Sequence, residues 1–315
     1  MPKAQLHHPF VVTLLAAACA GPPPAATAGT VERLLVCQGA ANTLALLDPA
    51  THTMLAAVPI GNWPREVVVA PDGRTAVVLG GGRTGWALTV VDVERAAVLR
   101  TISLAAPGGE VAAPRGRGPT GLTFVAPRQV LVVGVVLGRR LLVDLDRGAI
   151  EPRRLQGIEG GGVDAGGGAG SCAIDPARGA LWSVDEAAAT LTITPNGAAT
   201  RTIVTGEQPF RITFTPDGAL ALVSCTEAGV IEGYDAASGA RVFTMSIAGD
   251  TSELSALPMG LAVAADGRRA FVSCARGEYV AVIDLAQRCV IDRIVVPGGP
   301  DGVAFARFVP RALSR

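Results

Sequence analysis

Histidine is nearly absent from the body of this sequence, and that shortage excludes several kinds of enzyme. The chain has three histidines, of which His7 and His8 lie in an N-terminal apolar stretch and only His52 lies further on. One histidine in a turn cannot supply paired axial ligands for haem or a multi-histidine copper cluster. A Ser-His-Asp triad would have to use His52, which lies in a loop and away from the strand starts where a site is expected, so a triad is not predicted. We therefore predict no catalytic residue, no metal site and no cofactor.

Aromatic residues and net charge are also lacking. Aromatics make up 4% of the 315 residues, and 27 Lys and Arg balance 27 Asp and Glu. A neutral chain has no net field that attracts nucleic acid or an acidic membrane. So few rings do not make a platform on which bases stack. These shortages exclude nucleic acid as a partner.

The spacing typical of amphipathic helices is missing as well. Glycine is abundant, with 39 residues, and short runs rich in Val and Ala alternate with turn residues. Such runs favour strands joined by tight turns. A parallel sheet with crossover helices is therefore excluded, and the chain is predicted to be all-β.

The first 29 residues have the pattern of a secretory signal and a tether. Lys3 precedes the apolar run Phe10–Ala20, which is too short to span a bilayer. Two processing routes are open: Leu15–Cys19 is similar to a bacterial lipobox with Cys19 as the lipidated residue, and Ala26–Ala28 fits ordinary signal cleavage. We expect export to the periplasm, the outer membrane or the cell surface, with membrane contact only through a lipid anchor.

Residues 30–315 contain a repeated unit and are predicted to form one domain. The clearest copies begin at Gly61, Gly206 and Leu257, and each has an Asp-Gly turn between its first two strands. Weaker copies begin at Pro119, Gly170 and Pro300. The spacing of about 40 to 55 residues is the period of a four-stranded propeller blade. In the unit from Gly61 the expected strands are Arg65–Ala70, Thr75–Leu79, Ala87–Asp92 and Ala97–Leu104.

The two ends of the domain indicate how the ring closes. The first unit has only three strands, Arg33–Cys37, Thr43–Asp48 and Met54–Ile60, and the chain ends in a lone strand, Gly302–Arg307. Pairing the last strand with the first three completes a blade and removes two exposed edges. We predict a monomeric β-propeller with six blades. Seven blades would require a degenerate blade within the inserts Ala105–Gly118 or Gly157–Gly170, which otherwise have the composition of loops.

Several units resemble the YVTN-type β-propeller repeat. The segments NTLALLDPATHTMLAAVPIGNWPREVVVAPDGRTAVV and YVAVIDLAQRCVIDRIVVPGGPDGVAFA contain its V-x-V-I-D, I-x-V-G-x-x-P and P-D-G elements. The resemblance implies an exported bacterial or archaeal propeller that serves surface contact, binding or a periplasmic pathway. Related folds include lactonases and the propeller subunits of amine dehydrogenases, but a shared fold does not carry their chemistry.

The starts of the first strands predict a site, because in a propeller they surround the axis at one face. Polar side chains are expected there from four residues, Arg65, Glu66, Arg211 and Asp301. The two arginines could clamp a carboxylate or phosphate. Alternatively, the four residues pair with one another and close the channel. Gly121, Gly260 and Gly302 fall at the second position of their units, and Ser171 and Cys172 are predicted to fill the two mouth positions of the fourth.

The cysteines form a second pattern. Cys37, Cys225 and Cys274 each end a second strand and are predicted to be equivalent, with Cys172 at the mouth of a neighbouring blade. Equivalent residues on adjacent blades lie too far apart for a disulfide. We expect small buried side chains rather than a metal site.

Three functions follow from these observations. The first is a non-enzymatic binding protein that holds a protein, peptide or small ligand at the channel mouth. The second is a lactonase-like hydrolase that uses Glu66 and the arginines. The third is an accessory to a periplasmic quinoprotein or dehydrogenase system.

Overall fold

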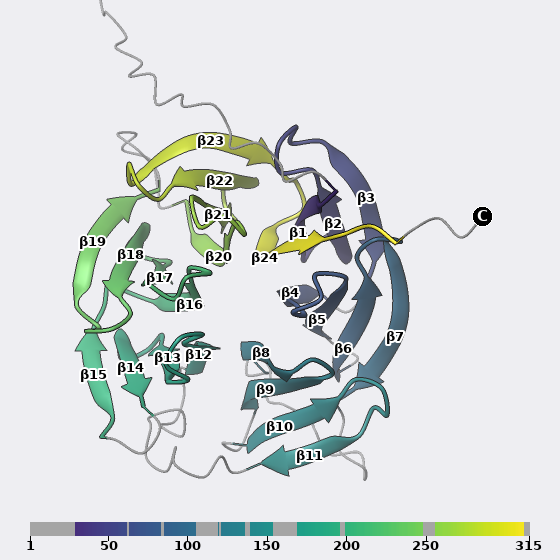
Figure 1. The fold of residues 1–315 in the computed structure, drawn as a ribbon, viewed down its shortest axis with the longest axis horizontal. Helices are drawn as coiled ribbons and strands as arrows, with labels where there is room; N and C mark the ends of the chain where they lie inside the picture. The colour runs from purple at the N-terminus through teal and green to yellow at the C-terminus, as the bar shows by residue number, and fades with distance from the viewer. Residues whose placement is uncertain are drawn as a thin grey trace, which may run out of the picture.

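The chain folds into a ring of six β-sheets (Figure 1). The computed structural model describes residues 29–61, 63–82, 85–104, 119, 121–135, 139–153, 169–195, 199–247 and 256–311. Within these ranges all regular structure is strand, in six four-stranded antiparallel sheets. The predicted six-bladed, all-β propeller is therefore confirmed. No helix within these ranges is long and apolar enough to cross a membrane.

Some sequence-based expectations fall outside the described residues. These are the signal segment with Cys19, the insert 105–118 and positions 157–168 of the second insert. The last two residues of that insert, expected in a loop, instead open a strand at Ala169.

Each blade contains four strands ordered from the axis outward. Blade 1 consists of β24 (Pro300–Phe308), β1 (Val31–Gln38), β2 (Thr43–Leu47) and β3 (Met54–Pro59). Blade 2 consists of β4 (Pro64–Val69), β5 (Thr75–Gly82), β6 (Gly85–Asp92) and β7 (Ala97–Ser103). Blade 3 consists of β8 (Gly121–Ala126), β9 (Gln129–Val135), β10 (Arg139–Asp144) and β11 (Ile150–Arg153).

The other three blades follow the same order. Blade 4 consists of β12 (Ala169–Ile174), β13 (Leu181–Asp185), β14 (Thr190–Thr194) and β15 (Arg201–Val204). Blade 5 consists of β16 (Pro209–Phe214), β17 (Leu220–Cys225), β18 (Val230–Asp235) and β19 (Arg241–Ser246). Blade 6 consists of β20 (Pro258–Val263), β21 (Arg269–Cys274), β22 (Tyr279–Asp284) and β23 (Cys289–Val295).

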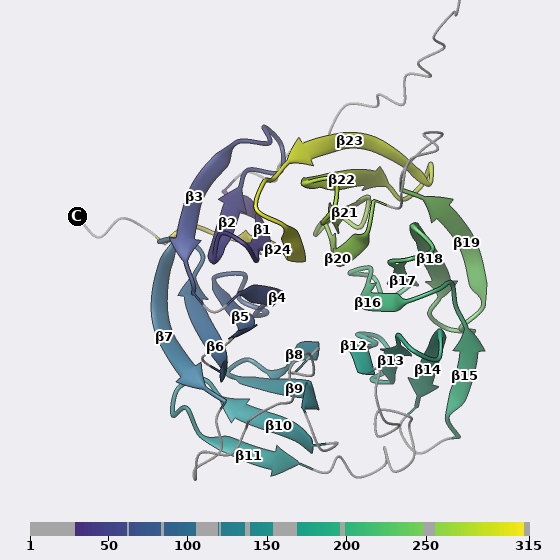
Figure 2. The same ribbon diagram turned by 180° about the vertical axis from the view of Figure 1, so that it is seen from behind.

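The C-terminal strand closes the ring as predicted. β24 pairs antiparallel with β1, so that Val303 lies opposite Val36 and Ala304 opposite Leu35. Figure 2 shows this strand beside β1 at the inner edge of blade 1. Because β24 supplies the innermost strand of blade 1, the two ends of the ring meet within one sheet and β1 is not left as an edge strand.

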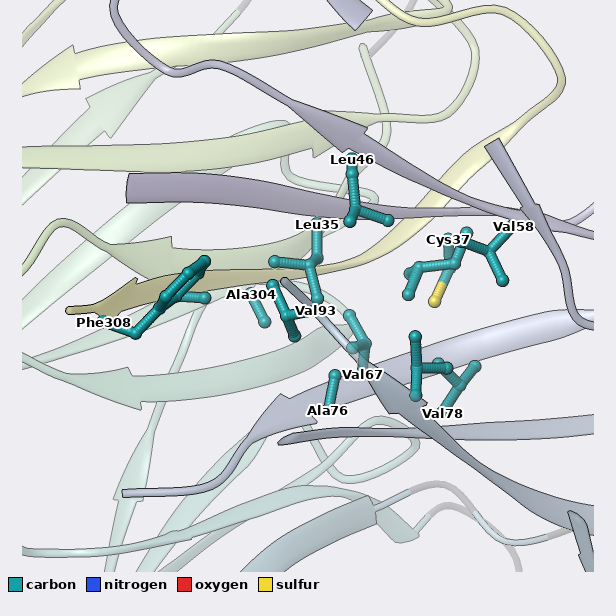
Figure 3. Packing of buried hydrophobic residues seen from close by; sticks show 13 residues of the cluster. Leu35, Cys37, Leu46, Val58, Val67, Ala76, Val78, Val93, Ala304 and Phe308 are labelled. Atoms are coloured by element: carbon teal, nitrogen blue, oxygen red, sulfur yellow. The ribbon is translucent and has the colours of Figure 1, made fainter. Parts of the chain in front are cut away.

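The core lies between neighbouring blades rather than at the axis. Figure 3 shows the cluster between blades 1 and 2, where Leu35 of β1 packs with Val67 of β4 and Val78 of β5. Ala304 and Phe308 of β24 belong to the same cluster, and Val303 belongs to the next one, between blades 1 and 6. Five clusters besides the one between blades 1 and 2 contain the buried apolar side chains on the other faces of the blades.

Tight turns hold each blade in register, and the Asp-Gly turn after β4 shows why glycine is needed. Gly73 has φ +68°, a conformation that residues with a side chain rarely adopt. A Cβ atom there would also collide with the backbone carbonyl of Arg307. The Asp72 carboxylate accepts the backbone N–H groups of Arg74 and Thr75. This turn therefore fixes blade 2 against the closing strand.

A truncation that removes β24 should abolish cooperative folding. A chain ending at Gly299 loses the buried side chains of Val303 and Phe308 and leaves β1 as an unpaired edge. The lost burial is worth roughly 5 kcal/mol or more, which is comparable to the whole stability of many domains. Urea unfolding followed by circular dichroism measures the effect. A chain ending at Arg311 is the control and should unfold like the full chain. A cooperative, equally stable chain ending at Gly299 would contradict the closure.

Candidate functional site

The four predicted polar residues come together on the axis. Arg65 and Glu66 begin β4 in blade 2, Arg211 is near the start of β16 in blade 5, and Asp301 begins β24 in blade 1. Blades 2 and 5 lie on opposite sides of the ring (Figure 1). A contact between Glu66 and Arg211 therefore spans the channel. We refer to Arg65, Glu66, Arg211 and Asp301 as the axial cluster.

Arg211 makes the contacts that cross the axis. Its Nε lies 3.8 Å from Oε1 of Glu66, and its Nη2 lies 3.8 Å from Oδ1 of Asp301. The same Nη2 donates a hydrogen bond of 3.4 Å to the backbone carbonyl of Arg65. The guanidinium carbon lies 4.2 Å from the centre of the Phe210 ring, which supports it from its own strand. One side chain thus joins three blades.

Three members of the cluster are deeply buried. Arg211 is 5% exposed, Glu66 6% and Asp301 7%. Arg65 is half-buried, and its Nε lies 3.7 Å from Oδ2 of Asp301. The alternative that these residues pair with one another is therefore what the structure shows, and the arginines already face carboxylates. A free pair of arginines that would clamp an anion is not the arrangement present.

The pairing leaves polar atoms unsatisfied. Oε2 of Glu66, Nε of Arg211 and Oδ1 of Asp301 are buried and have no hydrogen-bond partner among the described residues. Their ion-pair distances of 3.7 to 3.8 Å exceed ordinary hydrogen-bond lengths. Buried polar atoms of this kind are uncommon in folded proteins and costly. The axial cluster therefore has unused capacity to bind polar groups.

Serine side chains hold the inner strands at the correct spacing around the cluster. The backbone N–H of Arg211 donates to Oγ of Ser224 over 3.1 Å, and Ser224 donates to the carbonyl of Met259 in the next blade over 2.7 Å. Ser273 repeats the pattern one blade further on, accepting from the Gly260 N–H at 2.8 Å and donating to the Asp301 carbonyl. These bridges fix the backbone from which Arg211 and Asp301 project.

Glycines allow the close approach that the sequence predicts. A Cβ atom at Gly302 would lie 2.7 Å from the backbone carbonyl oxygen of Arg65. At Gly260 it would collide with the backbone carbonyl of Asp301. Each contact joins one inner strand to the next, so glycine is required for the strand starts to converge.

Burial changes the acidity of the cluster. Loss of solvent raises the pKa of Glu66 to about 7, although the positive charge of Arg211 opposes the shift. Burial likewise raises the pKa of Asp301 despite Arg211 and Arg65. Two carboxyl groups with raised pKa values in one cleft are a recognised sign of a functional site.

A cavity of about 310 Å³ extends from the cluster along the axis. Glu66, Ser171 and Arg211 line its polar end. The side chains further along are mainly apolar, and the inner strands present one unpaired edge each toward the axis. The apolar lining includes Val69, Phe124, Phe214, Val263 and Phe305. More of the accessible lining is polar than apolar, which agrees with backbone edges that face the axis. The cavity can therefore offer a small molecule both polar and apolar contacts.

Glu186 belongs to the site but was not predicted from the sequence. It lies in the hairpin between β13 and β14. Burial is the main cause of its raised pKa. The positive charges of Arg211 and Arg65 lower the pKa of its carboxyl group, and the negative charge of Asp301 raises it. Its neighbours in sequence, Glu186-Ala-Ala-Ala, carry no motif, so only the position of the hairpin beside the axis reveals it.

The register corrects the predicted equivalence of the cysteines. Cys225 pairs with Pro209 and Cys274 with Pro258, but the partner of Pro300 is Gln38. Gln38, and not Cys37, is therefore the residue equivalent to Cys225 and Cys274. Cys37 precedes it by one residue, so its side chain lies on the other face of the sheet. A slip of one residue reverses the face of a strand, and aligning cysteine with cysteine concealed it.

That slip places Cys37 beneath the axial cluster. The thiol is fully buried, packs in the cluster shown in Figure 3, and burial raises its pKa well above the ordinary value, with Asp301 adding to the shift. A raised pKa means little thiolate, so this thiol is unreactive. Cys225 and Cys274 are also fully buried, and the described cysteines form no disulfide.

Blade 4 is shifted in the same way. Ala169 pairs with Asp185 as Pro209 pairs with Cys225, so Ser171 rather than Cys172 occupies the position of Arg211. The predicted mouth pair of Ser171 and Cys172 is therefore wrong by one residue. Thr120, also at the mouth in the repeat pattern, lies outside the described residues.

His52 lies away from the site. It occupies the turn between β2 and β3, and its Nδ1 lies 3.5 Å from Oδ2 of Asp292. Within the described ranges, no group of three or more His, Cys, Asp or Glu side chains is arranged to hold a metal ion.

Comparisons with known proteins define the class as a β-propeller and no more. No family model matches the chain, the YVTN repeat included, and no curated protein matches it. The structures below are all under 25% identical, so they show the fold alone.

Three solved structures illustrate the similarity. A chain of a nidogen/laminin complex matches with 15% identity and a TM-score of 0.65, covering 87% of this chain and 98% of the other. A protein of unknown function from Bacteroides caccae matches with 15% identity and a TM-score of 0.62, covering 88% and 99%. Apo AztD from Citrobacter koseri matches with 12% identity and a TM-score of 0.59, covering 88% and 98%.

Replacing Arg211 by methionine should destabilise the fold. The change leaves Glu66 and Asp301 buried without their shared cation, and breaking a buried pair from one side costs about 3 to 5 kcal/mol. Urea unfolding at pH 8 measures the loss. Arg147→Met, at an exposed turn, is the control and should stay within about 0.5 kcal/mol of wild type. Equal stability of the two variants would show that Arg211 is not the cross-channel link.

Stability should fall as the pH rises from 5 to 8. Because the folded pKa of Glu66 is raised to about 7, its favourable contribution is complete below the unfolded pKa and is lost as the pH rises through 7. The size of the effect is roughly 3 kcal/mol. The lowered pKa values of Asp92, Asp146, Asp217 and Asp235 act in more acidic solution. Urea midpoints at each pH should slope for wild type and flatten for Glu66→Gln, and an unchanged slope would place the titrating group elsewhere.

Proposed function

We propose that this protein is an exported, non-enzymatic binding protein that holds a small ligand in its axial cavity. The observation that carries the proposal is the set of unpartnered atoms of Glu66 and Arg211 at the end of a cavity of about 310 Å³. Structural cores normally satisfy such atoms. A ligand that reaches the polar end would supply the missing partners.

The structure around the cavity holds its walls rigidly, which favours the binding of a ligand. The Ser224 and Ser273 bridges tie neighbouring inner strands together. Arg211 connects opposite sides of the ring. Rigid positioning of a few polar groups lowers the entropy lost on binding. Among structures of similar fold, one comes from a complex between two proteins, nidogen and laminin, so a binding role has a precedent within the fold.

The test is a ligand screen with a variant that blocks the cavity. A mixed library of neutral, cationic and anionic compounds would be examined by saturation-transfer NMR. Thr213 lines the cavity from β16, so Thr213→Trp should displace any ligand bound there. We expect hits that bind wild type and Arg147→Met but not Thr213→Trp. A screen in which no compound distinguishes Thr213→Trp from wild type would contradict the proposal.

A second candidate function is hydrolysis of lactones or related esters. The observation that favours it is the raised pKa of Glu66, about 7, beside the Arg211 guanidinium. A carboxylate with such a pKa is suited to accept a proton from water near neutral pH, and the guanidinium could stabilise negative charge on a carbonyl oxygen.

The hydrolase reading predicts turnover with a characteristic pH profile. Activity should rise with pH through about 7, because the base must be ionised, and Glu66→Gln should remove it. Assays on a lactone panel, with and without divalent metal, test this. Absence of turnover, or turnover that survives Glu66→Gln, would eliminate the role of Glu66 as base.

A further inference from the structure

The axial cluster together with Glu186 has more carboxyl groups than cations. The guanidinium groups of Arg65 and Arg211 face the carboxyl groups of Glu66 and Asp301 at 3.7 to 3.8 Å. The carboxyl group of Glu186, in the hairpin after β13, lies near enough for its pKa to respond to both arginines. The unpartnered atoms show the same imbalance, with two acceptor oxygens, on Glu66 and Asp301, against one donor nitrogen on Arg211. The local shortage is therefore of donors that carry positive charge.

One of the unpartnered acceptors belongs to a side chain that lines the cavity. Glu66 is 6% exposed and lines the cavity. The Ser171 side chain lies close enough to lower the pKa of the Glu66 carboxyl group, but no described residue reaches Oε2 at hydrogen-bond distance. Its other oxygen, Oε1, faces Nε of Arg211. A ligand group that meets Oε2 from the cavity thus completes the carboxylate without displacing Arg211.

Among the described residues, the connections around this end of the channel carry more negative than positive charge. Glu186 lies in a hairpin that joins the second and third strands of its blade, and the corresponding described hairpins carry Glu227 and Glu278 against Arg276. Glu207 lies in the neighbouring connection before β16. Carboxylates gathered around an opening attract cations and raise their local concentration.

The cavity wall limits what the cation can be attached to. Beyond the polar end, the lining includes the side chains of Phe214, Val263 and Phe305, with hydroxyl groups from Thr123 and Thr213. Together with the unpaired backbone edges of the inner strands, these side chains give a wall of mixed polarity that can hold a small organic body. The described residues contain no group of three or more His, Cys, Asp or Glu side chains arranged for a metal ion.

We propose that the ligand is a small organic ammonium compound, with its protonated amine at Oε2 of Glu66 and its apolar body along the cavity. The inference rests on the proposed binding function and adds the chemical class of the ligand. An ammonium group offers three N–H donors and a full positive charge. Asp301 and Glu186 strengthen the field that holds it, and charge-assisted hydrogen bonds of this kind are the stronger ones.

Ligand affinity should depend on pH through the Glu66 carboxyl group. The groups that face Glu66 are Arg65 on its own strand, Arg211 on β16, Asp301 on β24, Ser171 on β12 and the Cys37 thiol on β1. Burial keeps the Cys37 thiol protonated and raises the pKa of Glu66 to about 7, so Glu66 titrates in the neutral range. Because only its ionised form pairs with an ammonium, affinity should weaken by about tenfold between pH 8 and pH 6.

The experiment uses three probes of nearly the same shape and the full chain. Isothermal titration calorimetry would measure the binding of 2-phenylethylammonium, of the neutral 2-phenylethanol and of the anionic 3-phenylpropionate. We expect the ammonium to bind at least about tenfold more tightly than either of the others, since a matched charge contact is worth more than about 1.4 kcal/mol. Glu66→Gln should remove this preference, whereas Glu151→Gln, at an exposed position of the outer strand β11, should keep it.

The outcomes distinguish failure of the ammonium class from failure of the cavity as a binding site. Tighter binding of 3-phenylpropionate or 2-phenylethanol, lost in Thr213→Trp, would overturn the ammonium class and leave the cavity as a binding site. An ammonium preference that persists in Glu66→Gln would overturn the assignment to Glu66. If no probe binds, the ammonium class fails for this shape, and the mixed library decides separately whether the cavity binds anything. Thermal unfolding of Glu66→Gln confirms that the variant is folded.

Discussion

The structure around the axis depends on one buried guanidinium. Arg211 extends from blade 5 and meets Glu66 of blade 2 and Asp301 of blade 1. A buried charge is stable only when opposite charges and hydrogen bonds replace water. Here the carboxylates supply the charge, and the Arg65 carbonyl and Phe210 ring complete the shell. Because the contacts are longer than hydrogen bonds, the cluster spans the axis and still retains unsatisfied polar atoms.

The repeat makes this asymmetry possible. All six blades place a residue at the same point near the axis, and the register assigns these points to Glu66, Gly121, Ser171, Arg211, Gly260 and Gly302. Three glycines let the strand starts converge, while Glu66 and Arg211 fill the space from opposite sides. The scaffold is therefore nearly uniform, and the chemistry comes from the few positions at which the blades differ. A propeller fold alone, as shared with the similar structures, does not determine these residues.

The sequence predicts the fold well because its evidence is periodic. Asp-Gly turns, strand-length apolar runs and the lone final strand each have a local cause, so six blades and the closure by β24 follow without tertiary information. The same periodicity brings Arg65, Glu66, Arg211 and Asp301 to the axis. It does not show that Arg211 crosses the channel, because a pattern gives positions but no side-chain direction. Cys37 and Ser171 were each misplaced by one residue, since the register at a bulge is set by pairing. Glu186 carries no sequence signal at all.

The titration of the Glu66 carboxyl group tests the central claim most directly. With ¹³C-labelled glutamate, the carboxyl resonance that disappears in Glu66→Gln can be followed from pH 4 to pH 9. A buried carboxylate that faces Arg211 across the axis should titrate at about 7, and higher still in Arg211→Met, where the cation paired with it is removed. A midpoint near the ordinary value for glutamate, unchanged by Arg211→Met, would mean that Glu66 is solvated and that the axial cluster does not exist in solution.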